Sequence, residues 1–232
     1  MKMKFIFLAT MIMAVDTVGA QLAPGSFSVQ PRLGFTASKM SNVQAVQLGT
    51  DATLNSQLIG GLIIGADVEY QLTEPISISS GLNWAMAGCG WEDYETKKDG
   101  YTYELVNPRI QTAYLNIPVT ASFYIWKGLA LRIGVQMGFL TVANLMETVT
   151  VSGSKDGINF KTTTDSDESL KSSFNKFDLS IPFGLSYEFK NRIVVDARYN
   201  IGMTDLFKNS DPDGKNSRNR TFAITVGYKC RL

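Results

Sequence analysis

The residues best suited to chemistry in this chain are charged side chains that alternate with apolar ones. Asp67 and Glu69 stand two residues apart, and a carboxylate pair of this kind could in principle perform acid–base catalysis. The signs along the chain are mixed, which favours mutual pairing, because charges removed from water must be paired. The charged residues that share this alternating setting, interpreted here as facing one interior, are Arg32, Asp67, Glu69, Arg132, Asp178, Glu188, Arg192, Asp196, Arg198, Lys229 and Arg231.

The composition argues against several kinds of catalysis. The chain has no histidine, so Ser–His and Asp–His mechanisms are excluded, as is the commonest metal ligand. Its cysteines, Cys89 and Cys230, are too few and too far apart for a zinc site. We therefore predict no catalytic, cofactor-binding or metal-binding residues and no cofactor. The net charge of +1 gives no electrostatic reason to expect nucleic acid.

The clearest element that could position these charges is a hairpin, Phe177–Met203. Every second residue on both of its arms is apolar, and the residues between them are small, polar or charged. A period of two over about a dozen residues indicates a β-strand with one apolar and one polar face. The strands are about twice the usual length and match what is needed to cross a bilayer at a tilt.

The same alternation recurs in eight segments, which predict an all-β fold: an eight-stranded antiparallel up-and-down transmembrane β-barrel. The connections alternate between short turns and long loops, the layout of outer-membrane barrels with turns in the periplasm and loops outside. Besides the two arms of the hairpin, the segments are Phe27–Phe35, Leu58–Tyr70, Ile76–Met86, Tyr114–Ile125, Leu129–Thr141 and Phe222–Leu232.

Matching the strand faces predicts the register of two turns. Pairing Ile125 with Leu129 leaves a three-residue loop that ends in Gly128. Pairing Glu188 with Arg192 leaves Phe189–Asn191 as the loop and sets Pro182 opposite Arg198. In both turns the last loop residue tolerates the left-handed conformation that such a loop requires.

Two of the long loops contain hairpin signals of their own. Asp99-Gly100 and Asp156-Gly157 lie between β-rich runs, and Asp-Gly favours a tight turn. We expect polar extensions above the membrane, with Thr162–Lys176 as a mobile tip. The first extension carries aromatic residues that form a possible partner-contact surface, although cross-strand pairing alone would also explain them: Trp91, Tyr94, Tyr101 and Tyr103.

The N-terminus has the features of a secretory signal peptide. Lys2 and Lys4 precede the apolar run Phe5–Val15, and small residues end at Ala20. We predict residues 1–20 as a signal peptide and residues 21–232 as one barrel domain. Cys89 and Cys230 fall at opposite ends of that barrel, so we predict no disulfide between them.

Three short motifs, in order along the chain, resemble the outer-membrane β-barrel domain of Bacteroidota that is called PorT-like. They are SSGLNW (Ser79–Trp84), YLNIPVTASF (Tyr114–Phe123) and DARYNIGMTDL (Asp196–Leu206). The resemblance implies an OmpA/OmpX-like eight-stranded barrel in the bacterial outer membrane. It implies little about activity. Members usually end in an aromatic residue, whereas this chain ends in Leu232.

These observations lead to an expectation of a non-enzymatic outer-membrane protein whose lumen is plugged by a salt-bridge network. Its expected surroundings are outer-membrane lipids and lipopolysaccharide, with a protein or glycan partner at the extracellular loops and no nucleic acid. The alternatives are a narrow channel or small-ligand transporter, and an accessory component of an envelope secretion system. The sequence leaves the oligomeric state open.

Overall fold

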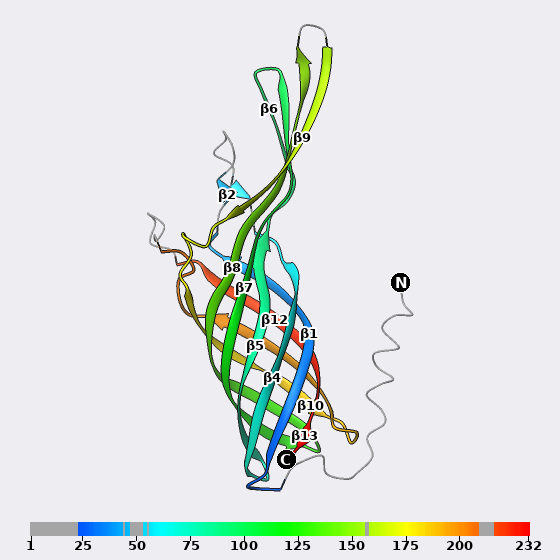
Figure 1. The fold of residues 1–232 in the computed structure, drawn as a ribbon, viewed down its shortest axis with the longest axis vertical. Coiled ribbons are helices and arrows are strands. Elements are labelled where there is room, and N and C mark those ends of the chain that lie inside the picture. Colours follow the sequence, from blue (N-terminus) through cyan, green and yellow to red (C-terminus); the bar gives the residue numbers. More distant parts are fainter. Residues whose placement is uncertain (1–22, 44, 47–52, 55, 156–157, 209–215) are drawn as a thin grey trace.

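The structure is a computed structural model that describes residues 23–43, 45–46, 53–54, 56–155, 158–208 and 216–232. The predicted signal peptide and the Asp156-Gly157 turn lie outside the described residues. Eight long antiparallel strands form a closed ring (Figure 1). They are β1 (Phe27–Ser41), β4 (Ile59–Thr73), β5 (Ile76–Gly90), β7 (Tyr101–Trp126), β8 (Leu129–Lys155), β10 (Phe177–Glu188), β11 (Ile193–Gly202) and β12 (Arg218–Tyr228).

The first and last long strands close the ring. β1 pairs with β12 from Arg32 opposite Gly227 to Ser41 opposite Arg218. The short strand β13 (Cys230–Arg231) continues this contact with β1. Every pair in the ring is antiparallel. Every pair except this closing one joins two of the eight long strands that follow each other along the chain. The predicted eight-stranded up-and-down barrel is therefore confirmed.

The two faces of each strand differ as the alternation predicts. Along β1 the residues from Ser28 to Met40 at even positions are buried, whereas Leu33 and Phe35 point outward and are 65% and 69% exposed. The outer surface of the barrel is thus apolar over its strands, and its interior is mostly polar. An apolar outer face and a polar lumen are what a membrane-spanning barrel requires.

Two hairpins extend the barrel at one end, which we call the arm end; the opposite end, with the short turns, is the turn end. β6 (Tyr94–Lys98) pairs with the upper part of β7, and β9 (Ile158–Ser169) pairs with the upper part of β8. Since β7 and β8 also pair there, the order is β6-β7-β8-β9, and this four-stranded arm rises beyond the barrel (Figure 1). The two-residue strands β2 (Ala45–Val46) and β3 (Thr53–Leu54) pair with each other in a separate small ribbon.

The turn at Asp99-Gly100 has the predicted tight form, with positive φ values of 53° and 82°. Residues 162–169 do not form the predicted tip, because they belong to β9, which continues to Ser169 in unbroken register with β8. This part of β9 has polar, exposed side chains and is held by backbone pairing with β8.

The two predicted turns at the turn end differ from expectation. The register of β7 and β8 is as predicted up to Tyr124 opposite Ala130, but an irregularity then leaves a two-residue loop, Lys127-Gly128. In the other turn Phe189 N donates to Ile193 O, and Arg192 rather than Asn191 has the positive φ, 65°.

The predicted register of the hairpin between β10 and β11 is therefore wrong by two residues. Glu188 lies opposite Val194, Pro182 opposite Asn200, and Arg198 opposite Gly184. A slip of two residues keeps every side chain on its face, so matching of faces could not detect it. The observed register places a glycine, rather than a proline, opposite the large Arg198 side chain.

Candidate functional site in the barrel lumen

The inward charges form two clusters, the first of them near the turn end. Lys229 Nζ lies 3.1 Å from Glu69 Oε2 and 2.7 Å from Glu188 Oε2. The Tyr124 hydroxyl donates to Glu69 Oε1 at 2.7 Å and accepts from Lys229 Nζ at 3.1 Å. Arg231 Nη2 lies 3.6 Å from Glu188 Oε1 at the turn-end opening of the lumen. Each carboxylate in this turn-end cluster therefore has a cation beside it.

The second cluster crosses the middle of the lumen. Arg132 Nη1 lies 3.1 Å from Asp196 Oδ2, and Arg198 Nε donates to Asp196 Oδ1 at 2.8 Å. Arg32 Nη1 lies 3.1 Å from Asp67 Oδ2, close enough for an ion pair but without hydrogen-bond geometry. Arg132 Nη2 lies 3.9 Å from the same Asp67 oxygen. All five side chains of this central cluster are at most 5% exposed.

Glycines on the neighbouring strands leave room for the guanidinium groups. Arg32 lies between Gly65 of β4 and Gly227 of β12. Gly184 of β10 lies between Arg198 of β11 and Arg132 of β8. Because a narrow barrel has only enough interior for its own side chains, large residues next to very small ones allow close packing.

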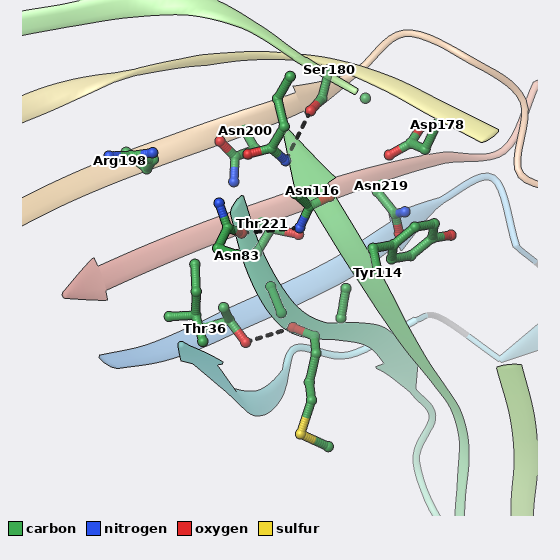
Figure 2. A pocket seen from close by; sticks show the side chains of 16 residues that line it. Thr36, Asn83, Tyr114, Asn116, Asp178, Ser180, Arg198, Asn200, Asn219 and Thr221 are labelled. Atoms are coloured by element: carbon green, nitrogen blue, oxygen red, sulfur yellow. Dashed lines mark hydrogen bonds between the residues drawn. The ribbon is translucent and has the colours of Figure 1, made fainter. Parts of the chain in front are cut away.

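A small cavity of about 30 Å³ lies above the central cluster. By volume it could hold about two water molecules. Arg198 is on one side of it and Asp178, Tyr114 and Asn219 are on the other (Figure 2). The Thr204 hydroxyl donates to Asp178 Oδ1 at 2.6 Å. Amide and hydroxyl groups line the space between them: Thr36, Asn83, Asn116, Gln136, Ser180, Asn200 and Thr221.

The arm end of the lumen is filled by apolar side chains, which we call the mouth cluster. Trp91 is only 6% exposed and belongs to this cluster, together with side chains from the barrel wall and from two connecting segments. Its members are Met40, Ala87, Cys89, Trp91, Ile110, Tyr114, Leu140, Ala143, Phe174 and Leu206. The alternating pattern did not reveal this cluster, because two of its large residues, Phe174 and Leu206, lie outside the strands.

The structure places most of the predicted lumen residues inside the barrel, but not all. The prediction for Arg192 is wrong: this residue is exposed in the turn between β10 and β11, where it is the last residue before β11 and has a positive φ value. Arg231 is at the turn-end opening of the lumen, with its side chain 35% exposed. Tyr124 was missed, although its position two residues beyond inward Ser122 would have indicated that it faces inward. The other predicted members, Arg32, Asp67, Glu69, Arg132, Asp178, Glu188, Asp196, Arg198 and Lys229, are buried.

Of the predicted aromatic surface, three residues remain together on the arm. The register places Tyr94, Tyr101 and Tyr103 on one face of the four-stranded arm, and all three are partly exposed. The Tyr101 and Phe160 rings are 5.7 Å apart across this face. The prediction that Trp91 belongs to this surface is wrong, because its side chain is buried in the mouth cluster.

Cys89 is buried in the mouth cluster and Cys230 is exposed at the turn end, and both are free, as predicted. Within the described ranges, His, Cys, Asp and Glu form no group of three that could hold a metal ion. The described ranges contain no helix that could span a membrane.

A closed antiparallel barrel with an apolar outside and a charged inside defines the class of bacterial outer-membrane barrels. The family described as "Outer membrane protein beta-barrel domain" matches residues 19–208. The chain therefore belongs to this family of outer-membrane proteins. A comparison with characterised protein sequences gives no match.

Several solved barrels are similar in structure at low identity. Ail, the attachment invasion locus protein of Yersinia pestis, is 12% identical, with 89% of this chain and 99% of that chain covered and a TM-score of 0.38. Neisserial surface protein A is 13% identical, with 88% of this chain and 97% of that chain covered and a TM-score of 0.42. The outer membrane protease OmpT from Escherichia coli is 12% identical, with 92% of this chain and 99% of that chain covered and a TM-score of 0.38. Likenesses at this level carry no argument about activity.

Proposed function

We propose that this protein is a non-enzymatic outer-membrane barrel whose lumen is closed to solutes and whose arm contacts a partner outside the cell. The observation that supports closure is the balance of charge in the described part of the lumen. Five inward cations, counting Arg231 at the turn-end opening, accompany five inward carboxylates. The cations are Arg32, Arg132, Arg198, Lys229 and Arg231, and the carboxylates are Asp67, Glu69, Asp178, Glu188 and Asp196.

Closure would follow from three successive layers. The turn-end and central clusters occupy an interior that eight strands make just wide enough for side chains. Opening a path between paired buried charges would require their separation, which costs several kcal/mol for each charge left unpaired. Above them, the mouth cluster offers a permeating ion mainly apolar groups, such as those of Met40 and Phe174.

The same contacts argue against catalysis by the carboxylate pair. Asp67 is next to Arg32 and Arg132, and Glu69 is held by Lys229 and Tyr124. The cavity near the central cluster has a volume of about 30 Å³, which is too small for an organic substrate. These carboxylates therefore serve pairing within the barrel.

Conductance in planar lipid bilayers tests closure. The purified, folded protein should give no discrete openings, whereas a wide water-filled porin reconstituted in the same way should conduct and acts as the positive control. Discrete openings of the folded protein would contradict the closed lumen and favour the channel alternative.

The arm is the proposed contact surface because its two faces differ. One face carries Tyr94, Tyr101 and Tyr103 beside Leu105 and Val149, whereas the other carries mainly threonine and charged residues. Aromatic rings with a hydroxyl suit surfaces that are apolar in part and hydrated in part, such as protein or glycan contacts. The partly exposed aromatic face thus supports a binding role for the arm.

A triple variant tests this role. Y94S/Y101S/Y103S should abolish binding of the protein to glycan arrays and to intact cells. T102A/T148A/T150A changes the opposite face, where the hydroxyls of Thr150 and Thr163 are 3.1 Å apart, and should retain binding. Equal binding by both variants would exclude the aromatic face as the contact surface.

A further inference from the structure

Three cations gather on the outside of the barrel where its first and last strands meet. Lys39 of β1 lies directly opposite Arg220 of β12, and Arg218 lies opposite Ser41 one outward position further. The alternation along both strands points all three side chains outward, with Lys39 and Arg220 exposed and Arg218 partly exposed. We call these three residues the rim patch; β1 and β12 run side by side in Figure 1.

The rim patch has no acidic counterpart in the described part of the chain. None of the ion pairs found there includes Lys39, Arg218 or Arg220. Arg218 Nε is buried and has no hydrogen-bond partner among the described residues. Like charges directly opposite each other in an antiparallel pair are destabilising. An anion supplied from outside the chain would relieve this repulsion.

The position of the rim patch indicates where such an anion would come from. The next outward pair toward the turn end is Ala37 opposite Phe222, followed by Phe35 opposite Ile224. Phe35, Ile224 and Phe222 are 69%, 47% and 42% exposed and belong to the apolar outer band. Since one outward position is two residues, Lys39 and Arg220 lie roughly 7 Å beyond that band along the direction of the tilted strands. This is the level of lipid headgroups at the arm end of the barrel.

We propose that the rim patch binds the phosphate groups of lipids in the outer leaflet of the outer membrane. Two arginines can each hold a phosphate through two parallel hydrogen bonds, and the lysine adds a compact charge. The proposal rests on the membrane setting that the family defines. It does not rest on closure of the lumen or on a partner of the arm, so it can fail without either of them failing.

Equilibrium binding of fluorescent, phosphorylated lipid A to the detergent-solubilised full-length protein tests the proposal. Each cation close to an anionic surface changes affinity about fivefold, so K39Q/R220Q should bind about 25-fold more weakly than the wild type. K97Q/K98Q removes the same charge from β6 on the arm, where Lys97 and Lys98 are exposed, and should bind like the wild type. An equal loss in both variants would show a general effect of net charge and overturn the proposal.

Two further measurements separate the phosphate from the rest of the lipid and from free anions. Lipid A without phosphates should bind weakly and equally to the wild type and to K39Q/R220Q. Inorganic phosphate in millimolar excess should leave lipid binding largely intact; full competition would indicate a general anion site and would contradict a lipid site.

Folding of the variants is checked by the shift in electrophoretic mobility on heating. K39R/R220K keeps both charges and should restore most of the lipid binding. Failure of this charge-preserving variant, despite a folded barrel, would also contradict the proposal.

Discussion

Arg132 of β8 and Asp196 of β11 form an ion pair of 3.1 Å across the lumen, although β10 separates their strands in the barrel wall. The second terminal nitrogen of Arg132 donates to Ser79 Oγ at 2.8 Å and to Thr120 Oγ1 at 3.2 Å. One guanidinium therefore connects Asp196 with groups on β5 and β7. A side chain that ties several strands together in this way should contribute strongly to stability.

The first prediction concerns the carboxylate at the centre of this arrangement. Asp196→Asn leaves Arg132 and Arg198 without their shared charge, and breaking a buried pair costs about 3–5 kcal/mol. The free energy of unfolding in urea, measured by tryptophan fluorescence in lipid vesicles, should fall by that amount. The folded variant should still have the wild-type circular dichroism spectrum.

Asp165 provides the matched control, because it is an aspartate on an exposed strand, β9. Asp165→Asn keeps an oxygen that can accept from the Thr148 hydroxyl, and surface changes of this kind usually alter stability by less than about 0.5 kcal/mol. A similar loss in both variants would mean that the buried charge at Asp196 has no special role.

The second prediction concerns the close approach of strands at Gly184. A Cβ atom at this residue would lie 2.1 Å from the backbone oxygen of Ala197 and 2.7 Å from Arg198 Cα. Gly184→Ala should therefore destabilise the barrel by about 1–3 kcal/mol, the usual cost of overpacking. Gly60→Ala is the control, since the nearest atom to its Cβ would be 4.0 Å away. Urea unfolding of both variants would contradict this account if Gly60→Ala proved the more harmful.

The third prediction concerns the hydroxyl of Tyr124, which lies between Glu69 and Lys229. Tyr124→Phe removes one hydrogen bond to each charged group, and such bonds contribute about 1.5–3 kcal/mol. Tyr228→Phe is the matched control, because Tyr228 points outward and is 46% exposed. Only the first variant should lower the urea midpoint, and unchanged stability would assign Tyr124 a packing role alone.

Sequence reasoning identified the faces of the strands because the period of two is a direct consequence of strand geometry. It placed Arg32, Asp67 and Asp196 in one interior for that reason. It could not determine the register of β10 and β11, because slips of two residues preserve the faces. That slip is why Arg192 was expected in the lumen but lies in a turn.

The mouth cluster was beyond the reach of the pattern for a different reason. Trp91 follows the end of β5 and Phe174 lies in a connection after β9, so neither has an alternating context. Their burial depends on how the barrel end and its loops meet in space. The aromatic pattern near Asp99-Gly100 therefore suggested a surface residue where Trp91 fills the interior.

The fourth prediction concerns the two free cysteines. Cys89 is 0% exposed within the mouth cluster, whereas Cys230 is exposed on β13 at the turn end. Since a thiol must reach its reagent to react, the folded protein should incorporate one N-ethylmaleimide per chain and the denatured protein two, as measured by intact mass. Cys230→Ser should react only after unfolding, whereas Cys89→Ser should react fully while folded. Rapid labelling of Cys89 in the folded Cys230→Ser variant would show that the mouth cluster opens readily, and it would weaken the case for a closed lumen.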